Sequence, residues 1–408
     1  MGKPKIRFKG YEDDWEQRKL DSWGTFYYGR SCPKWSVTED ATIPCIRYGE
    51  LYTKFGAKID RVYSYTNMPP ENLRFSKGTE VLIPRVGEDP MDYNHCTWLS
   101  MPDVAIGEMI SVFNTDNNPL FTATMFNATL QNEFAMRVEG GSVTNLYFEK
   151  LKNIEVSFPS IQEQEKIAAY FENLDHLITL HQRKCEETKS LKKYMLQKMF
   201  PENGKCVPEI RFSGFSDAWE QRKLGEIYGS IGNAFVGTAT PYYVEQGHFY
   251  LESNNVKDGQ INHNSEIFIN DEFYEKQKDK WLHTGDVVMV QSGHVGHAAV
   301  IPKELNNTVA HALIMFRNPK EEIEPYFLNY EYQTDKVKKK IENITTGNTI
   351  KHILASDMQE FVVDVPKYEE QKVIASYFSH LDHLITLHQH KCDELQKLKK
   401  FMLQNMFV

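Results

Sequence analysis

The chain repeats one plan twice, and this duplication limits its possible folds more than any other feature. The phrase IRFKGYEDDWEQRKL at 6–20 returns as IRFSGFSDAWEQRKL at 210–224. A longer echo pairs 159–200 with 366–407, and 22 of the 31 positions aligned from Tyr170 onward are identical. Self-similarity of this kind indicates a repeated structural unit, so we expect a pseudo-two-fold arrangement of two halves.

Between the echoes lie two segments of similar length that share only scattered positions, here called domain 1 and domain 2. A chain of 408 residues is too long for one hydrophobic core, so several domains are expected. The predicted division is an N-terminal repeated motif (1–20), domain 1 (21–158), a first long helix (159–200), a linker with the repeated motif (201–224), domain 2 (225–365) and a second long helix (366–408).

The duplicated 159–200 and 366–408 segments read as helices. Ser160 followed by Glu163 has the spacing of a capping box at a helix start. Residues in each segment, with Thr188 among those of the first, then recur at gaps of three, four and seven, close to the 3.5-residue period of a coiled coil. About 40 residues form a rod of roughly 60 Å, and we expect the two rods to pair antiparallel. The predicted seam comprises Leu174, Leu177, His181, Leu191 and Met195 in the first helix and Leu381, Leu384, His388, Leu395, Leu398 and Met402 in the second.

Each variable domain contains short apolar runs between turn residues, which indicate strands. The runs at 80–84 and 286–290 are each bounded by glycines, and those at 154–158 and 361–365 lead into the long helices. A helical stretch is expected at 326–341. The predicted fold class is mixed α/β, with two globular domains separated by two long antiparallel helices in a coiled coil.

Composition excludes several other classes of protein. The chain is 41% hydrophobic and 25% charged, which is ordinary for a globular protein. No apolar run approaches the roughly 20 residues of a membrane helix, and the N-terminus lacks the apolar core of a secretory signal. Six cysteines without CxxC spacing favour reduced thiols. We therefore expect a cytoplasmic protein without a membrane partner.

Four pairs of matching runs stand in the same order in both halves. They are WEQRKL at 15–20 and 219–224, PSIQEQEKI at 159–167 with PKYEEQKVI at 366–374, LDHLITLHQ at 174–182 and 381–389, and GGSVT at 140–144 with TGNTI at 346–350. In order and duplication, the whole chain resembles the specificity subunit of type I restriction–modification systems.

The resemblance implies a DNA-reading adaptor without catalysis of its own. Each variable domain would be a target recognition domain that reads one half of a bipartite, asymmetric site in double-stranded DNA. The paired helices would set the spacer and dock two methyltransferase (modification) subunits that methylate adenine, and motor-nuclease (restriction) subunits would join them. No cofactor is then expected on this chain, while S-adenosylmethionine, ATP and Mg belong to the partners. The alternation of divergent domains with near-identical helices supports this interpretation independently of the resemblance. Two domains that read different half-sites must differ in sequence, whereas a surface that binds the same partner twice must stay the same.

Candidate DNA contacts were chosen by residue type, because base edges are read by Arg, Lys, Asn, Gln and Ser and phosphates by cations. Domain 1 has a basic and aromatic cluster near residue 50 and an arginine after the run 80–84. Domain 2 has polar runs in the corresponding places and a lysine-rich stretch. The candidates are Arg47, Tyr48, Lys54, Lys58, Arg61 and Arg85 in domain 1, and Ser253, Asn254, Asn255, Lys257, Gln291, Ser292, His294 and Lys338 in domain 2, with Lys336, Lys339 and Lys340 as further phosphate contacts.

The charge of the chain argues against tight DNA binding by this subunit alone. The net charge is -9, and 12 basic against 17 acidic residues leave domain 1 at -5, while 12 against 20 leave domain 2 at -8. Strong non-specific affinity requires phosphate neutralisation by cations. We therefore expect partner subunits to supply much of the positive clamp.

Three motifs that suggest other chemistry are weaker than their alternatives. His181 with Cys185, and His388 with Cys392, have the i, i+4 spacing of metal ligands. Polar or small positions that fix the register of a helix seam explain them better, and no metal is expected. The run 67–70 (NMPP) departs from the Asn/Asp-Pro-Pro-Tyr/Phe loop of adenine methyltransferases, and 292–297 lacks the lysine of a phosphate loop.

Two other functions stay open from the residues alone. One is an enzyme that reads and modifies DNA unaided, which would require a cofactor or metal motif. The other is a coiled-coil scaffold whose variable domains bind proteins.

Overall fold

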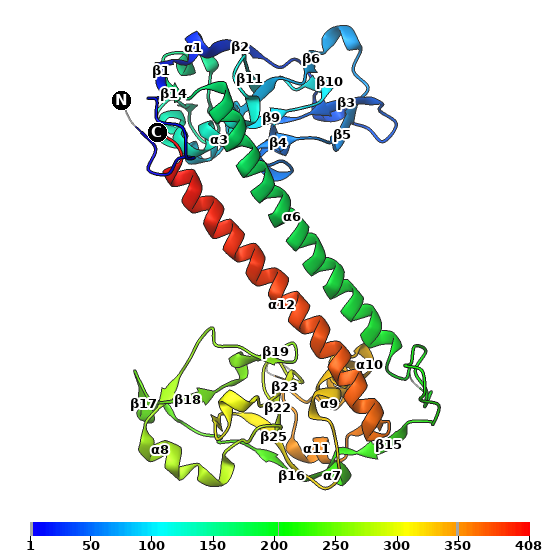
Figure 1. Ribbon diagram of the computed structural model, residues 1–408. Helices are drawn as coiled ribbons and strands as arrows, with labels where there is room; N and C mark the ends of the chain where they lie inside the picture. The colour runs from blue at the N-terminus through cyan, green and yellow to red at the C-terminus, as the bar shows by residue number, and fades with distance from the viewer. Residues whose placement is uncertain (1–2, 203, 348–350) are drawn as a thin grey trace. The chain divides into compact units, whose positions relative to one another are not determined.

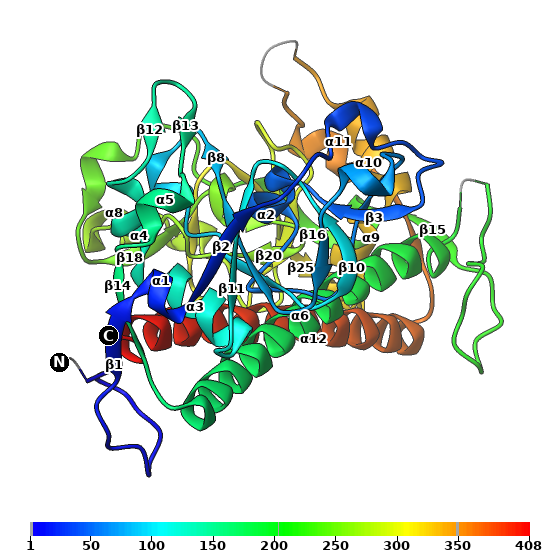
Figure 2. The same ribbon diagram turned by 90° about the horizontal axis from the view of Figure 1, so that it is seen from above.

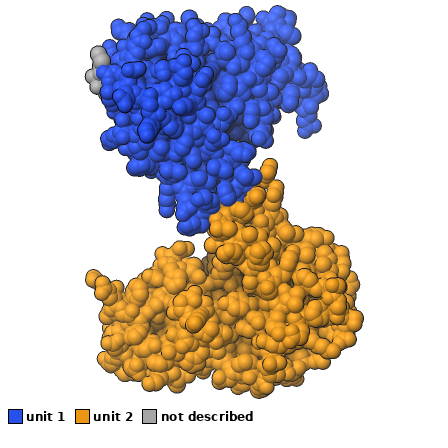
Figure 3. Space-filling view, viewed as in Figure 1, with its two compact units in different colours: residues 1–182, 390–408 blue, residues 183–389 orange. Residues whose placement is uncertain are grey.

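A computed structural model describes residues 3–202, 204–347 and 351–408. The chain forms two compact units (Figures 1 and 3): unit 1 contains Met1–Gln182 and His390–Val408, and unit 2 contains Arg183–Gln389. Both boundaries fall inside the 38-residue helices α6 (Ile161–Lys198) and α12 (Tyr368–Asn405). Each unit therefore consists of one variable domain and a part of each long helix.

Domain 1 is built on a five-stranded sheet of order β2-β11-β7-β9-β4 and a four-stranded sheet of order β5-β3-β10-β6. The central strand β7 is buried along its whole length. The strands are β2 (Gly24–Tyr28), β3 (Ile43–Ile46), β4 (Lys58–Ile59), β5 (Ser64–Thr66), β6 (Phe75–Lys77), β7 (Glu80–Pro84), β9 (Thr97–Leu99), β10 (Pro102–Ile106) and β11 (Ile110–Thr115), with a small sheet of β8 (Val86–Gly87), β12 (Glu139–Gly140) and β13 (Thr144–Asn145). The helices are α1 (Leu20–Trp23), α2 (Tyr48–Thr53), α3 (Pro119–Thr129), α4 (Gln131–Ala135) and α5 (Phe148–Leu151), with 3-10 turns η1 (Lys34–Ser36), η2 (Pro70–Asn72) and η3 (Pro90–Asp92).

Domain 2 has two four-stranded sheets, of order β16-β25-β22-β23 and β17-β21-β18-β24, and a β19–β20 pair. The strands are β16 (Tyr228–Asn233), β17 (Tyr243–Val244), β18 (His248–Leu251), β19 (Val256–Lys257), β20 (Gln260–Ile261), β21 (Phe268–Ile269), β22 (Val287–Val290), β23 (Ala298–Val300), β24 (Val309–Ala310) and β25 (Leu313–Pro319). The helices are α7 (Leu224–Ile227), α8 (Asp271–Lys276), α9 (Pro325–Glu331), α10 (Asp335–Ile344) and α11 (Ala355–Gln359), with 3-10 turns η4 (Thr240–Tyr242), η5 (Ser253–Asn255), η6 (Lys278–Lys280) and η7 (Lys303–Leu305).

The two domains share strand topology despite their different sequences. In domain 1, β3 pairs parallel with β10 and antiparallel with β5. In domain 2, β18 pairs parallel with β24 and antiparallel with β21. The central strands β7 and β22 each pair antiparallel with the long strand that precedes the next helix, β11 or β25. These observations confirm the mixed α/β class and the repeat of one architecture.

The repeated WEQRKL phrase is a strand that joins each domain to its long helix. In unit 1, β1 (Glu16–Lys19) pairs antiparallel with β14 (Glu155–Phe158). In unit 2, β15 (Glu220–Lys223) pairs in the same register with β26 (Val362–Val365). The tryptophan before each strand is buried, with 2% of Trp15 and 3% of Trp219 exposed. The end of the segment predicted as a linker thus belongs to the core, because an aromatic side chain and a paired strand bury area that a free linker would leave in water.

A buried ion pair fixes the start of each long helix. Arg7 donates to both carboxylate oxygens of Glu163, at 2.7 and 2.8 Å, and Arg211 does the same to Glu370 at 2.7 Å. The glutamates are 1% and 2% exposed. Glu163, which the sequence predicts as a capping residue, therefore links the repeated N-terminal phrase to the helix. Such bidentate, charge-assisted pairs fix orientation as well as adding energy.

The ends of the long helices occupy equivalent positions in the two units. The Ile210 N–H donates to the carbonyl of Lys198 at the end of α6, at 2.9 Å, and the Ile6 N–H donates to Asn405 at the end of α12 at the same distance. Phe200 contacts Trp219 as Phe407 contacts Trp15, at ring distances of 5.8 and 6.4 Å. In unit 2 the segment 201–218 connects Phe200 to Trp219 along the chain. In unit 1 the contact between Phe407 and Trp15 instead joins the C-terminal segment to the N-terminal one.

The two helices α6 and α12 pair antiparallel in each unit, as predicted (Figures 1 and 2). In unit 1, Phe171 stacks on Phe407 and Lys399 binds Asp175 at 2.5 Å. In unit 2, Lys192 binds Asp382 at 2.6 Å. Low numbers on α6 face high numbers on α12, which requires opposite directions.

The predicted seam is correct at some positions and wrong at others. Leu174, Leu381 and Leu395 are buried, but Leu177, Leu191 and Leu398 are 40%, 45% and 41% exposed. Leu384 is half-buried, as are His181, Met195, His388 and Met402. Further buried residues of α6 are Ile178, which follows Leu177, and Cys185 seven positions later. In α12 a further buried residue is Cys392. Both sets fit a seven-residue period, and one residue turns the side chain by about 100°, so packing decides the register.

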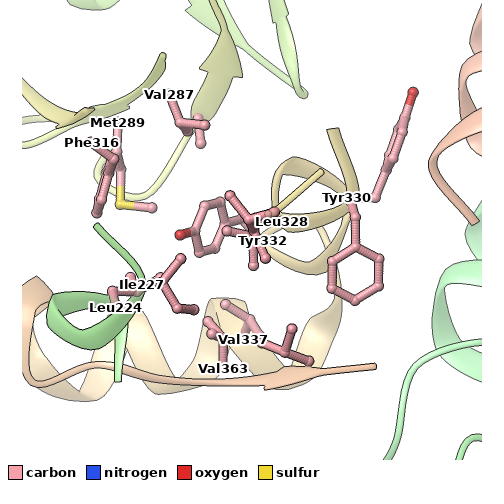
Figure 4. Close-up of a cluster of buried hydrophobic side chains, with 14 of the residues drawn as sticks. Leu224, Ile227, Val287, Met289, Phe316, Leu328, Tyr330, Tyr332, Val337 and Val363 are labelled. Atoms are coloured by element: carbon pink, nitrogen blue, oxygen red, sulfur yellow. The ribbon is translucent and has the colours of Figure 1, made fainter. Parts of the chain in front are cut away.

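The largest cluster of buried side chains lies in unit 2 (Figure 4). It joins Leu224 and Ile227 from the helix after the repeated phrase to Phe316 in the sheet, Tyr332 after α9 and Val363 in β26. The repeated motif and the variable domain therefore share one core. Of the helices that the structure describes, none is both long and apolar enough to cross a membrane.

Candidate nucleic-acid interface

Two candidate residues of domain 1 lie where β3 enters α2. The backbone N–H of Arg47 donates to Glu50 Oε2 at 2.9 Å, and Glu50 Oε1 accepts from the hydroxyl of Ser64 at 2.7 Å. These bonds tie the start of α2 to strand β5. Tyr48 is 36% exposed beside Arg47, so the turn presents a cation and a ring to solvent.

The other candidates of the first cluster differ in how free they are. The ammonium of Lys54 lies 5.5 Å from the ring centre of Tyr63, and Arg61 is 69% exposed with Asp60 3.6 Å away. Lys58 instead binds Glu172 of α6 at 2.5 Å and lies over Trp98. Lys58 therefore contributes to the contact between domain 1 and its helix.

Arg85 follows β7 as predicted and is packed rather than free. Its carbonyl accepts from Leu146 at 2.8 Å, and its guanidinium lies 4.9 Å from the ring centre of Tyr28. The β12–β13 hairpin, which carries the predicted run 140–144, pairs with β8 directly after Arg85. The structure thus brings these two predicted segments together.

In domain 2, η5 directly follows β18 just as α2 follows β3, so the predicted correspondence of the two turns holds. Ser253 is half-buried, and Asn254 and Lys257 are exposed. Asn255 is 1% exposed; its Oδ1 accepts from the N–H of Glu252 at 3.0 Å and its Nδ2 donates to the carbonyl of Asn262 at 3.1 Å. Its amide closes the turn from inside, so Asn255 is not placed to contact DNA.

The loop after β22 lies beside the segment before α11. The Ile353 N–H donates to the carbonyl of Gln291 at 3.0 Å, and Ser292 forms a β-bridge with His352. His294 is exposed. This neighbourhood repeats that of Arg85 and the β12–β13 hairpin. Of the predicted run 346–350, residues 348–350 lie outside the described residues.

The lysines of α10 divide between surface and core. Lys338 and Lys339 are exposed. Lys336 binds the buried carboxylate of Asp364 and donates to the carbonyl of Pro201, and Lys340 donates to that of Val362. Lys336 is thus engaged in the fold because a buried carboxylate requires a partner, and it is not free to bind a phosphate.

Lys338 lines a cavity of about 420 Å³ in unit 2, between domain 2 and the helix pair. The same cavity is lined by Lys192, which is paired with Asp382, and by His297. Burial lowers the pKa of His297, while Asp258 opposes this shift. The cavity has both signs of charge, so its lining alone does not select an anion.

Several exposed aromatic residues of domain 1 escaped the sequence reasoning. Trp35 is 72% exposed, Tyr63 50% and Tyr65 42%. Tyr63 and Tyr65 stand two residues apart, which is the spacing of one face of a strand. That spacing was the available signal, but residue type alone gave priority to cations.

The helix thiols are seam residues. Cys185 is buried, with its sulfur 3.8 Å from the carbonyl of Ile385 and from Oε1 of Gln389. Within the described residues, no group of three or more His, Cys, Asp and Glu side chains has a metal-binding arrangement.

Solved structures share this fold. A type I restriction–modification S subunit from M. genitalium aligns over 100% of this chain and 99% of its own, with a TM-score of 0.64 and 13% identity. A chain from a structure on complex assembly and conformational transition of the type I R-M system aligns over 98% and 99%, with a TM-score of 0.52 and 16% identity.

Sequence comparisons lead to the same group of proteins. The putative MjaX specificity subunit of Methanocaldococcus jannaschii is 25% identical over 62% of this chain and 58% of its own length. The MjaVIII specificity subunit of the same organism is 22% identical over 65% of this chain and 64% of its own. The matches thus span less than two thirds of these curated relatives.

The profile of the type I restriction modification DNA specificity domain matches residues 102–190 and 216–397, once in each half of the duplication. The first range contains the later part of domain 1, the second contains all of domain 2, and together they contain most of each long helix, including the strands β14 and β26 and the helix starts at Glu163 and Glu370. The chain therefore belongs to the family of type I restriction modification DNA specificity domains.

Proposed function

We propose that this chain is the sequence-reading subunit of a type I restriction–modification complex, in which domain 1 and domain 2 each read one half of a bipartite DNA site. The observation that carries the proposal is the contrast between a repeated frame and divergent loops. Arg7–Glu163 and Arg211–Glu370 match closely, whereas the loops after β3 and β18 differ in sequence and form. These repeated contacts would hold two domains in the same way while each domain reads a different DNA sequence.

In this proposal the chain performs no catalysis. S-adenosylmethionine, ATP and Mg would be bound by partner subunits, and DNA methylation and restriction would take place there. The acidic totals of both domains support a division of labour, in which this subunit selects the sequence and the partners supply much of the positive clamp. The paired helices would set the spacer between the half-sites.

A duplicated apolar patch supports docking of two copies of one methyltransferase subunit. Unit 1 exposes Leu177, Leu398 and Phe401, and unit 2 exposes the matching Leu384, Leu191 and Tyr194, of which Leu384 is half-buried. On α6, Leu177 and Leu191 are each turned by about 100° from the inner positions Ile178 and Lys192. An exposed apolar patch of this kind marks an interaction surface. The motor-nuclease subunits would join the same assembly.

Exchange of residues 21–158 for the corresponding domain of another family member tests half-site reading. Methylome sequencing of a host that carries the chimera should show one changed half-site, the other half unchanged and the same spacer length. The reciprocal exchange of 225–365 is the matched control and should change the other half. A change in both halves after one exchange would contradict the modular reading.

Polar substitutions in the patches test docking. In the unit 2 patch, Leu191→Ser with Tyr194→Ser should remove one of two methyltransferase subunits, and Leu398→Ser with Phe401→Ser should remove the other. Light scattering on the purified complex measures the loss as the mass of one subunit. Thr179→Ala with Thr386→Ala, exposed on another face of the helices, is the control. If the chain with all four substitutions still bound two methyltransferase subunits, this surface would be excluded as their docking site.

A further inference from the structure

One end of domain 1, residues 30–77, exposes aromatic side chains from three elements; we call it the aromatic lobe. Trp35 comes from η1, Tyr48 from α2, and Tyr63 and Tyr65 from β5 or its first flank. Their exposed fractions run from 36% for Tyr48 to 72% for Trp35. Large rings are costly to leave in water, so four of them in one small region require an explanation.

Hydrogen bonds hold these elements in one rigid arrangement. The Thr66 hydroxyl donates to the Ser36 hydroxyl oxygen at 2.8 Å, and the Asn67 N–H donates to the Ser36 carbonyl at 2.9 Å, so η1 is fixed against the end of β5. Ser64 binds Glu50 of α2 at 2.7 Å. The rings are therefore presented by a preorganised surface.

The strand pattern places Tyr63 and Tyr65 on the outer face. Thr66 is buried and Ser64 is half-buried, while the alternate residues Tyr63 and Tyr65 are exposed. Strand β5 is the edge of its sheet, next to β3 only. Figure 1 shows β3, β5, β6 and β10 together at one end of domain 1.

The lobe is positively charged within an acidic domain. Residues 30–77 contain 8 Lys and Arg against 5 Asp and Glu, a net charge of +3. The rest of domain 1 contains 4 against 12, a net charge of -8. Adding β10 brings in Asp103 and leaves the lobe at +2. The lobe cations without an ion pair to a carboxylate in the described chain are Arg30, Lys34, Arg47, Lys54, Arg74 and Lys77.

Domain 2 lacks this combination in its corresponding sheet. Residues 234–285 contain 4 Lys against 8 Asp and Glu, a net charge of -4. Its rings stack on one another: Tyr242 lies 4.4 Å from Phe273, and His248 lies 3.6 Å from Tyr274. These aromatic residues of domain 2 thus pack against one another, whereas Trp35, Tyr63 and Tyr65 of domain 1 are exposed.

We propose that the aromatic lobe is the main DNA contact of domain 1, with Trp35, Tyr63 and Tyr65 packing against bases of its half-site while the unpaired cations neutralise the flanking phosphates. The inference rests on the proposed function and names the surface that performs it. The charge selects a polyanion, and exposed rings beside cations match the stacking and wedge contacts that proteins make to unstacked bases. A base contact is worth about 1–3 kcal/mol per ring.

The test uses the complete complex with methyltransferase subunits and a duplex that carries the site identified by methylome sequencing. Trp35→Ala with Tyr65→Ala should weaken specific binding by about 10-fold to 100-fold, as expected for one or two lost stacking contacts. Trp35→Phe with Tyr65→Phe should restore most of it. With 2-aminopurine placed along the half-site of domain 1, the wild-type complex should increase its fluorescence at one step, and the alanine variant should abolish that increase.

A second variant separates charge from stacking. Lys34→Gln with Lys54→Gln should lower the salt dependence of binding by about two phosphate contacts, a slope reduction of roughly 1.8, and the aromatic variants should keep the wild-type slope. Tyr326→Ala, an exposed ring of domain 2 at 37%, is the matched control and should leave the half-site of domain 1 unaffected.

Three outcomes overturn the inference. Wild-type affinity in the Trp35/Tyr65 alanine variant would show that the rings do not touch DNA. Loss of methyltransferase subunits from that variant would make the lobe a protein-binding surface. The third outcome is failure of the phenylalanine variant to restore binding, which would count against stacking. Rescue by phenylalanine, together with an unchanged thermal midpoint, would exclude loss of fold as the cause of weaker binding. Absence of any sequence-specific binding by the wild-type complex would instead contradict the proposed function itself.

Discussion

Units 1 and 2 hold their domains through the same contacts and differ in the domain interior beside those contacts. In both, the N–H before a proline-led helix donates to a glutamine of the long helix at 2.9 Å, Asn118 to Gln164 and Glu324 to Gln371. Seven residues after these donors, Met125 in α3 is buried among apolar side chains, whereas Glu331 in α9 is buried with its carboxylate. The frame is thus held at a few repeated contacts, and the domain interior can change even close to them.

The largest effect should come from breaking the frame. Glu163→Gln and Glu370→Gln should each lower the free energy of unfolding by about 3–5 kcal/mol, because each leaves a buried guanidinium without its partner charge. Urea denaturation of the full chain measures both. Arg7→Met with Glu163→Leu, which removes both charges, should recover most of the loss. If one glutamine variant were neutral and the other severe, the two frames would not be equivalent.

A second effect, smaller per pH unit, distinguishes the units by their pH dependence. Burial raises the pKa of Glu331 to about 8. The hydrogen bond from the Asp364 N–H and the charges of Lys336 and Lys340 oppose this shift, whereas the Asp364 carboxylate adds to it. An unfolded glutamate releases its proton near pH 4.3, so between about 4.3 and 8 the folded state binds more protons than the unfolded one. The free energy of unfolding should therefore fall as pH rises through this window, by at most about 1.4 kcal/mol per pH unit, and level off above it.

Glu331→Gln should flatten this pH dependence, which unfolding midpoints at pH 5, 6, 7 and 8 would show. Met125→Leu, at the matching place in unit 1, should shift the midpoints equally at every pH. An unchanged slope in Glu331→Gln would mean that Glu331 is ionised throughout.

The smallest effect concerns the contact of α9 with the helix pair. Tyr330 donates to Asp382 at 2.9 Å, and Lys192 binds the same carboxylate. Unit 1 has Thr124 at the matching place, beside Asp175 and a cavity of 150 Å³. Tyr330→Phe should cost about 1.5 kcal/mol of unfolding free energy, the worth of one hydrogen bond to a charged group. Tyr326→Phe is the control. If both variants lost the same free energy of unfolding, the hydrogen bond of Tyr330 would not distinguish unit 2 from unit 1.

Much of the fold was predictable because duplication exposes what must stay constant. The repeated segments gave the helices and their antiparallel pairing, and the apolar runs at 80–84 and 154–158 became strands. The site was less predictable, because residue type does not report whether a side chain is free. Lys58 and Lys336 are bound to carboxylates, Asn255 closes a turn, and exposed Trp35 was overlooked.

Repetition and periodicity along the chain are enough to predict the duplicated plan, the mixed α/β class and the long helices. Which residues form the seam depends instead on packing, since Leu177 and Ile178 fit the same period and differ by a turn of about 100°. Tertiary contacts also determine which charged side chains form ion pairs within the fold, as Arg7 does with Glu163, and which stay unpaired on the aromatic lobe. Pairing and exposure depend on residues distant in sequence, and no local pattern encodes them.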